Sequence, residues 1–321
     1  MDWDEQRLGR RLKLRDLNVL MTVARCGSMG KAAVQLGVSQ PAISRAIVDM
    51  EHTLGVRLLD RSPQGVEPTI YARALLDRGV IAFDELRQAM EHIEFLVDPT
   101  AGELRIGASI VKAAGIVAAV VDRLSRRYPR IVFHLLAAES GIMYRALEDR
   151  KVDLIVSTVF VPIAEEHMHA ESLYDEPHVV VAGLQNAWTR RRRVELSELI
   201  NEPWTLPPPD TLTGSVVGEA FRSAGLDVPP TTIITSNTPL RTALLATGRF
   251  LTIVPESVLT FPVTNLALKR LPIDLPTTRR TVAIITLKHR TLSPVAQLFM
   301  DCARELAKPL TKLDKAGANL D

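Results

Sequence analysis

The chain has 321 residues, more than one ordinary hydrophobic core holds, and its 46% hydrophobic and 24% charged residues are typical of a soluble globular protein. These figures exclude a disordered chain. They also exclude a membrane protein, because the longest apolar run, 113–121, is too short to span a bilayer. The sequence opens without the pattern of a signal peptide, so we expect a cytoplasmic protein of two or more domains.

The two cysteines, Cys26 and Cys302, lie far apart and belong to no metal-spaced set. His167 and His169 have no third ligand at a useful spacing. The sequence therefore predicts no metal, no cofactor and no disulfide framework, as fits a reducing compartment.

Positive charge is concentrated near the amino terminus, although the net charge of the chain is only +2. Between residues 7 and 48 there are eight basic residues and one acidic residue, Asp16. Such an asymmetry indicates an anionic polymer as partner. The basic residues are Arg7, Arg10, Arg11, Lys13, Arg15, Arg25, Lys31 and Arg45.

Residues 27–47 predict two short helices joined by a tight turn. Ala32 and Ala33 give the first helix a small face for close packing, and Gly37 supplies the left-handed residue that ends it. Ser39 can cap the second helix, where Pro41 suits the first turn. This is the pattern of a helix-turn-helix.

The second of these helices has one apolar and one polar face. Ile43 and Ile47, four residues apart, face the core. Gln40, Ser44 and Arg45 remain on the opposite face near the helix start, where a recognition helix meets base edges. Arg reads guanine and Gln reads adenine through paired hydrogen bonds, so this face predicts DNA recognition.

Residues 55–69 read as a strand, a Pro/Gly turn and a second strand. This arrangement predicts a wing beside the helix-turn-helix, with Arg61 able to reach a phosphate or the minor groove.

An unbroken helix is predicted at 70–97, with apolar residues that recur every seven positions and Gly79 as its weak point. Such a stripe either packs on its own domain or forms a coiled-coil seam with a second copy. We expect the second copy, because no other element of the first domain is large enough to cover the stripe. The residues of the seam are Leu76, Phe83, Leu86, Met90, Ile93 and Val97.

Residues 98–102 contain Pro and Gly and predict a hinge. Beyond it, β-branched runs alternate with helical segments, and this order implies a parallel sheet with right-handed crossovers. The first set of strands is predicted at 104–107, 131–136 and 152–158, and a second set at 179–182, 204–206, 232–234 and 251–254. A late strand is predicted at 281–286 and a last helix at 294–307, followed by a polar, frayed tail at 309–321.

The stretch AAVQLGVSQPAISR at 32–45, the stretch LGVRLLDRS at 54–62 and the long helix behind them resemble the LysR-type transcriptional regulators, and the resemblance covers nearly the whole chain. It implies an α/β multidomain protein with a winged helix-turn-helix at 1–69 (core 14–69), a linker and dimerisation helix at 70–97, a hinge at 98–102 and an effector-binding domain at 103–308. That domain is expected to be two-lobed, like periplasmic binding proteins, with lobe I at 103–175 and 289–308 and lobe II at 176–288.

The resemblance also implies which residues meet DNA and what the protein assembles with. Double-stranded DNA with a dyad-symmetric operator is the expected partner, bound by a dimer or tetramer, and a contact with RNA polymerase is compatible with this role. The expected DNA-binding residues are Lys31, Ser39, Gln40, Pro41, Ser44, Arg45, Arg61 and Thr69.

Two features depart from the family pattern. Roughly ten extra residues precede the usual start, and Met29-Gly30 replaces a more polar or aromatic pair. The extension either adds phosphate contacts through Arg7, Arg10 and Arg11 or is inert, and we favour an inert extension.

Hydroxyl residues mark the predicted helix starts of the effector domain, at Ser109, Ser140, Thr213 and Thr238. In open α/β folds ligands bind at strand carboxyl ends, where helix starts converge, and the free N–H groups there favour anions. We therefore expect a small carboxylate or similarly polar metabolite as effector, although any one of these residues could be an ordinary cap. The expected effector-binding residues are Ser109, Ser140, Thr158, Thr211, Thr213, Asn237 and Thr238.

Three alternatives remain. An enzyme on an α/β scaffold is disfavoured, because the sequence has no Gly-rich phosphate loop, nucleophile elbow or metal-spaced ligand set, so nothing nominates a catalytic residue. A solute-binding protein is disfavoured by the DNA-binding pattern and the lack of an export signal. A nucleoid protein without sequence specificity would not need the effector domain.

Overall fold

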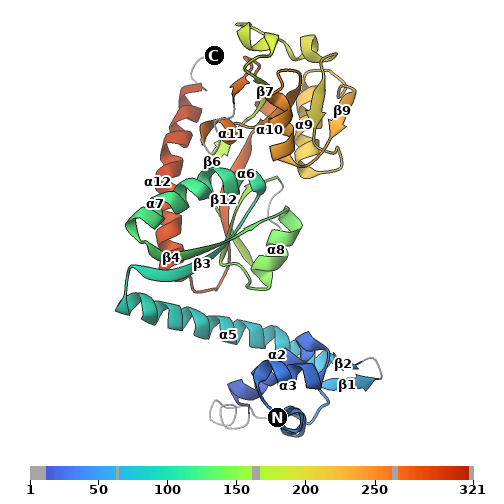
Figure 1. Ribbon diagram of the computed structural model, residues 1–321, viewed down its shortest axis with the longest axis vertical. Coiled ribbons are helices and arrows are strands. Elements are labelled where there is room, and N and C mark those ends of the chain that lie inside the picture. Colours follow the sequence, from blue (N-terminus) through green and yellow to red (C-terminus); the bar gives the residue numbers. More distant parts are fainter. Residues whose placement is uncertain (1–11, 63–64, 161–166, 262–266, 318–321) are drawn as a thin grey trace. The chain divides into compact units, whose positions relative to one another are not determined.

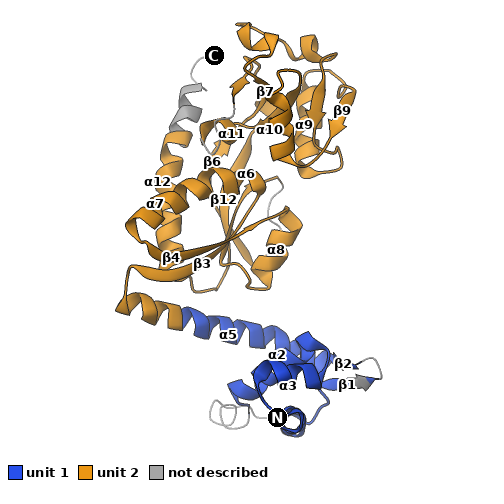
Figure 2. Ribbon diagram, viewed as in Figure 1, with its two compact units in different colours: residues 1–89 blue, residues 90–321 orange. Residues whose placement is uncertain are grey.

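The computed structural model describes residues 12–62, 65–160, 167–261 and 267–317 (Figure 1). The chain forms two compact units, Met1–Ala89 and Met90–Asp321 (Figure 2). The boundary falls inside the long helix α5 (Ile70–Val97), so that each unit contains part of it. Among the described residues, no helix is both long and apolar enough to cross a membrane.

The first unit confirms the predicted helix-turn-helix. Gly37 has the expected left-handed backbone, with φ at +66°, and the Ser39 hydroxyl accepts from the Ala42 N–H at 3.4 Å. Ile43 and Ile47 are completely buried in the core between the helices. The elements are α2 (Leu14–Cys26), α3 (Met29–Leu36), α4 (Gln40–Leu54), β1 (Leu59–Ser62), β2 (Gly65–Pro68) and the start of α5.

The wing is the antiparallel pair β1–β2, in which Arg61 lies opposite Val66. It is held against the turn that follows α2, because the Val66 N–H donates to the Gly27 carbonyl at 3.0 Å. A β-carbon at Gly65 would lie only 2.5 Å from that carbonyl oxygen, so glycine is needed for the close approach. Met29, one of the departures from the family pattern, is buried in the core.

The second unit contains two sheets, and the first of them defines lobe I. Its strand order is β4-β3-β5-β12-β6, with β3 parallel to β4 and β5 but β12 antiparallel to β5 and β6. Helices α7 and α12 cover one face of the sheet and α8 covers the other (Figure 1). The bounds are β3 (Ala101–Ala108), α6 (Ile110–Lys112), a π-helical turn (Ala113–Val117), α7 (Ala118–Arg127), β4 (Arg130–Ala137), α8 (Ser140–Glu148), β5 (Leu154–Val159), β6 (Met168–Glu176), β12 (Arg280–Leu287) and α12 (Pro294–Gly317).

The second sheet defines lobe II and has the order β11-β7-β10-β8-β9. Helices α9 and α10 pack on opposite faces of it. The bounds are β7 (His178–Gly183), β8 (Trp204–Leu206), α9 (Leu212–Ser223), β9 (Thr231–Ile234), α10 (Thr238–Leu245), β10 (Leu251–Pro255), α11 (Ser257–Thr260) and β11 (Leu268–Arg270), with 3-10 turns at Ala187–Arg190, Leu196–Leu199 and Pro276–Thr278.

The chain passes between the lobes twice, at Pro177 and at Arg279. Two hydrogen bonds link these crossovers: the His178 N–H donates to the Thr278 hydroxyl at 3.1 Å, and the His178 Nδ1 lies 3.0 Å from the Thr278 carbonyl oxygen. The two crossovers therefore form one joint between the lobes.

The lobe boundaries predicted from the sequence were wrong at one place. Residues 280–287 were assigned to lobe II, but β12 lies between β5 and β6 in the sheet of lobe I. That sheet is accordingly mixed rather than wholly parallel. The assignment depends on pairing partners more than 100 residues earlier in the chain, which the local pattern of a strand does not reveal.

Two further predictions need correction. The hinge at 98–102 is shorter, because β3 already begins at Ala101; Gly102 makes room for Val295, whose Cγ2 would lie 2.7 Å from a β-carbon there. The tail is not frayed from residue 309 onward, because α12 continues to Gly317 and Leu310 packs against the lobe I core.

Candidate functional site

The face of α4 that is predicted to recognise DNA is largely open to solvent. The side chains of Gln40 and Arg45 are open to solvent, and that of Ser44 is half-buried. Lys31, on the neighbouring helix α3, is also exposed. The arrangement leaves polar and basic groups free for base edges and phosphates while the opposite face of α4 fills the core.

The other predicted DNA-binding residues have mixed surroundings. Pro41 lies in the first turn of α4 and Ser39 caps it, so both shape the start of the recognition helix. The Thr69 hydroxyl donates to the Arg57 carbonyl at 2.8 Å and accepts from the Ala72 N–H at 3.2 Å, so it already joins the wing to α5. Arg61 lies in strand β1 of the wing.

The predicted dimerisation stripe of α5 divides into two parts. Leu76 packs against the core of the first unit, which corrects the expectation that this domain leaves the whole stripe uncovered. Phe83 is half-buried, whereas Leu86, Met90 and Ile93 are each about half exposed or more, at 46%, 57% and 54%. Large apolar side chains in a row on one helix are unusual on a free surface.

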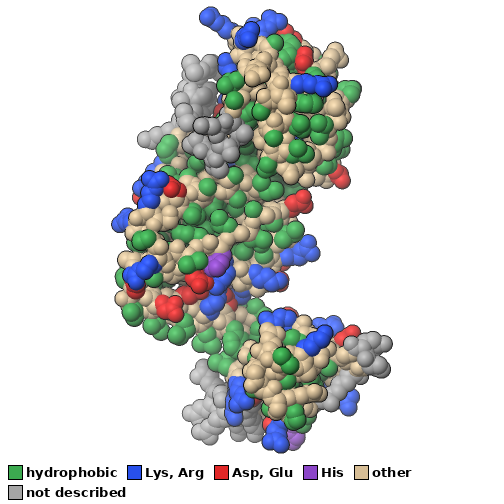
Figure 3. All heavy atoms as spheres, viewed as in Figure 1, with side chains coloured by type: hydrophobic (Ala, Val, Ile, Leu, Met, Phe, Trp, Pro, Cys, Tyr) green, Lys and Arg blue, Asp and Glu red, His purple; other side chains and the backbone are tan. Residues whose placement is uncertain are grey.

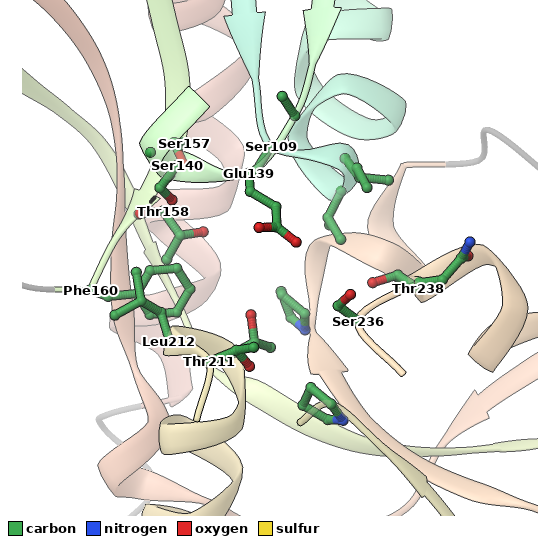
Figure 4. A pocket seen from close by; sticks show the side chains of 18 of the residues that line it. Ser109, Glu139, Ser140, Ser157, Thr158, Phe160, Thr211, Leu212, Ser236 and Thr238 are labelled. Carbon is green, nitrogen blue, oxygen red and sulfur yellow. Dashed lines mark hydrogen bonds between the residues drawn. The ribbon is translucent and has the colours of Figure 1, made fainter. Parts of the chain in front are cut away.

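A cavity of about 560 Å³ lies between the two lobes of the second unit. Residues at or just beyond the carboxyl ends of β3, β4 and β5 line it from lobe I, and residues beyond β8 and β9 line it from lobe II (Figure 4). All seven predicted effector-binding residues are among them: Ser109, Ser140, Thr158, Thr211, Thr213, Asn237 and Thr238.

Several of these residues differ from their predicted capping roles. Helix α9 is capped by Thr211, whose hydroxyl accepts from the Gly214 N–H at 3.0 Å, and Thr213 lies inside the helix. Asn237 caps α10 by accepting from the Leu240 N–H at 2.9 Å. Glu139, rather than Ser140, occupies the cap position of α8, and its side chain makes no capping bond. A hydroxyl near a helix start therefore indicated the right region but not the capping atom.

Arg241 is the main charged group that the sequence analysis did not identify. Its side chain lines the cavity and is 1% exposed. The guanidinium donates to the Thr252 hydroxyl at 3.2 Å, the Ile253 carbonyl at 3.3 Å and the Thr238 hydroxyl at 3.1 Å, and burial lowers its pKa to about 10. Within the described part of the chain it has no carboxylate partner, and its Nε–H has no acceptor.

His178 lines the same cavity from the crossover and is 1% exposed. Burial lowers its pKa to about 4, so the ring is neutral at neutral pH. Its Nε2 has no hydrogen-bond partner among the described residues. The neutral imidazole therefore leaves one buried nitrogen without a partner among the described residues, at the joint between the lobes.

A buried ion pair lies at the same joint. Lys112 of α6 binds Glu176, the last residue of β6, and its Nζ donates to the Ser257 hydroxyl at 2.9 Å. The Ser257 N–H donates in turn to the Glu176 carboxylate at 3.2 Å. Burial lowers the pKa of Lys112, against the opposing effect of Glu176. The network connects a lobe I helix to both the crossover strand and α11.

The residues missed in the sequence carry weak signals. Arg241 lies near the start of α10 among the apolar residues Leu240, Ala243 and Leu244, a position where a buried charge is rare unless it has a role. Glu139 directly precedes the hydroxyl at Ser140, and His178 precedes an apolar strand. The described residues contain no cluster of His, Cys, Asp and Glu that would hold a metal ion.

Two family models match the chain. The one described as "Bacterial regulatory helix-turn-helix protein, lysR family" matches residues 14–73, and the one described as "LysR substrate binding domain" matches residues 98–308.

Curated relatives of similar length include two transcriptional regulators. The transcriptional dual regulator GltC of Bacillus subtilis is 27% identical over 294 residues, which are 90% of this chain and 96% of the relative. The regulator TdcA of Escherichia coli is 24% identical over 293 residues, 91% and 93% of the two chains.

Solved structures share the fold. A full-length OxyR variant from Pseudomonas aeruginosa has a TM-score of 0.65 at 20% identity and covers 91% of this chain and 95% of its own. CbnR in complex with its target DNA has a TM-score of 0.54 at 22% identity, with 92% and 100% covered. Because one family model covers most of the chain and a second covers the helix-turn-helix, the protein belongs to the LysR family and is a DNA-binding transcriptional regulator with a substrate-binding domain.

Proposed function

We propose that a small anionic molecule, a carboxylate or a similarly polar metabolite, binds in the cavity between the lobes and controls the binding of this regulator to DNA. The observation that carries the proposal is Arg241. A fully buried guanidinium that lacks a carboxylate partner is costly in a folded protein, and an anionic ligand would supply the missing charge.

The surroundings of Arg241 support an anion at this place. The cavity is bordered by the first residues of α8, α9 and α10, whose free N–H groups and positive dipole ends favour negative charge. The hydroxyls of Ser109, Ser140 and Thr158 in lobe I and of Thr213 in lobe II make no side-chain hydrogen bond within the described residues, so they can bind the polar part of a ligand.

The DNA-binding part of the proposal rests on the exposed face of α4 and the apolar stripe of α5. Two copies joined along Leu86, Met90 and Ile93 would present two recognition helices to a dyad-symmetric operator, with further assembly to a tetramer compatible with the same contact. A regulator of this kind acts in the cytoplasm and has RNA polymerase within reach at its operator.

Ligand binding would act on DNA binding through the lobes. Closure of the cavity bends the joint at Pro177 and Arg279, shifts the packing between protomers and changes the angle between paired DNA modules. The free energy for switching comes only from the difference in ligand affinity between the two arrangements.

The first test is footprinting of the purified protein at fixed salt on the DNA upstream of its own gene, with and without a panel of small carboxylates. We expect protection of a dyad-symmetric segment, altered by at least one carboxylate. Arg241→Met should abolish that alteration and retain protection without ligand, whereas Arg222→Met, an exposed arginine on α9, should leave both unchanged.

Two results would contradict the proposal. Binding to scrambled DNA as tight as to the upstream segment, under every ligand condition, would favour a nucleoid protein instead. If a carboxylate still alters the footprint of Arg241→Met, Arg241 does not form the anion site.

A further inference from the structure

The cavity contains charges of both signs. Arg241 contributes a buried positive charge from lobe II, while Glu139 from lobe I and Asp210 from the loop before α9 contribute exposed carboxylates. Within the described residues, neither carboxylate makes an ion pair or a side-chain hydrogen bond. Figure 4 shows the Glu139 carboxylate pointing into the cavity, toward the side where Thr238, Ser236 and Thr211 lie. A ligand with only negative charge would be repelled by these groups.

The donors of Arg241 limit where an anion can bind. A guanidinium has five N–H donors, and the bonds to Thr252, Ile253 and Thr238 use three of them, two on Nη1 and one on Nη2. The donors that remain are one Nη2–H and the Nε–H, whose nitrogen is buried and has no acceptor among the described residues. An oxygen of a bound carboxylate would give the remaining guanidinium donors an acceptor.

From these observations we infer that the effector belongs to the amino-acid class: its carboxylate binds the guanidinium of Arg241, and its protonated amine binds Glu139, with Asp210 adding negative potential nearby. This inference rests on the proposed function, because it takes the cavity as the effector site. A simple cation is excluded by the buried guanidinium, and a simple anion leaves Glu139 facing a like charge. The volume of about 560 Å³ lies in the usual range for small-molecule sites.

The test compares matched ligands that differ only in the amine. Calorimetric titration of the full-length protein would use the proteinogenic amino acids together with the corresponding des-amino acids, for example leucine with 4-methylpentanoate and glutamate with glutarate. We expect at least one amino acid to bind, with its des-amino partner about tenfold weaker, as for loss of one charge-assisted hydrogen bond.

The variant Glu139→Gln assigns the amine contact. It should weaken the amino acid about tenfold and leave the des-amino acid unchanged. The substitution should not disturb the fold, since the Glu139 side chain makes no capping bond to α8. Asp227→Asn removes one exposed carboxylate elsewhere in lobe II and serves as the matched control, with no expected change.

The outcomes separate this inference from the proposed function. A des-amino acid that binds as tightly as its amino acid overturns the amino-acid class and keeps the anion site. An amino acid whose affinity is the same in Glu139→Gln overturns the role of Glu139. If neither series binds, both the inference and the proposed anion site are overturned.

Discussion

The two units of this regulator carry their functional groups in opposite ways. The residues at the start of α4 that are predicted to face DNA lie within one short stretch of sequence, and the side chains of Gln40 and Arg45 are exposed. In the second unit the cavity collects residues from Ser109 to Pro255, and its polar side chains include Ser157, His178 and Arg241, each only 1% exposed.

In the first unit, the residues predicted to bind DNA should therefore contribute little to stability. In the second unit, the buried residues of the cavity should contribute both to folding and to ligand binding. An exposed side chain on α4 can change without loss of packing, so substitutions there should affect binding alone. A buried charge in the second unit has been removed from water, so substitutions there should affect folding as well as ligand binding.

The largest effect is expected for Lys112→Met. It leaves Glu176 charged, buried and without its partner, and should lower the free energy of unfolding of the second unit by roughly 3–5 kcal/mol. Denaturant unfolding followed by tryptophan fluorescence would measure it, because Trp204 is in the lobe II core and Trp188 packs against that core.

Two controls sharpen this prediction. The double variant Lys112→Met with Glu176→Gln removes both charges and should recover much of the loss. Arg123→Ala, which breaks an exposed ion pair with Glu305, should cost at most about 1 kcal/mol. Equal losses for Lys112→Met and Arg123→Ala would show that burial does not distinguish the two pairs.

The opposite behaviour is expected for Arg45→Ala. Loss of a base contact should weaken operator binding by roughly 1–3 kcal/mol, with unfolding changed by less than about 0.5 kcal/mol. Parallel titrations of operator and scrambled DNA at one salt concentration would measure the ratio of affinities. Arg25→Ala, on the exposed end of α2, is the matched control and should leave that ratio unchanged. A preserved ratio in Arg45→Ala would remove α4 from base recognition.

The buried His178 predicts that the stability of the second unit depends on pH. Its pKa is about 4 in the folded protein and 6.5 as the ordinary value, so the unfolded chain binds the proton more readily. Stability should therefore fall as the pH drops from about 6.5 toward 4, by about 2 kcal/mol between pH 7.5 and 5. Unfolding of wild type and His178→Gln at both pH values would measure it. The same loss in both proteins would assign the dependence to other groups.

Much of the DNA-binding unit was predictable because its signals are local. Gly37, Ser39 and Ile43 each fix a helix end or a core position within a few residues of themselves, and the structure has them in those roles. Thr69 and Leu76 were less predictable: their partners are the Arg57 carbonyl and the core of the unit, which only the folded chain brings to them.

The second unit was predictable in its elements and less so in their assembly. Runs of β-branched residues indicated the strands, but β12 joined the other lobe because its partners, β5 and β6, lie far away in sequence. The cavity followed from a general rule about strand ends, so its hydroxyl residues were predicted together. The rule concerns backbone geometry and is silent on charge, which is why Arg241 and Glu139 were missed.

The smallest effect is expected for a substitution of Lys31, which tests whether the predicted DNA-binding surface extends from α4 to α3. Lys31→Gln removes a charge that would contact phosphate, so it should weaken all DNA nearly alike and reduce the slope of log affinity against log salt by about 0.9. Titrations of operator and scrambled DNA at several salt concentrations would measure both slopes. Lys288→Gln, an exposed lysine of the second unit, is the control for net charge. If both variants flatten the slope equally, the salt dependence arises from the charge of the whole chain. Lys31 would then have no special electrostatic role in DNA binding. If only Lys31→Gln does so, α3 contributes to the same surface as α4, and the face extends beyond the recognition helix.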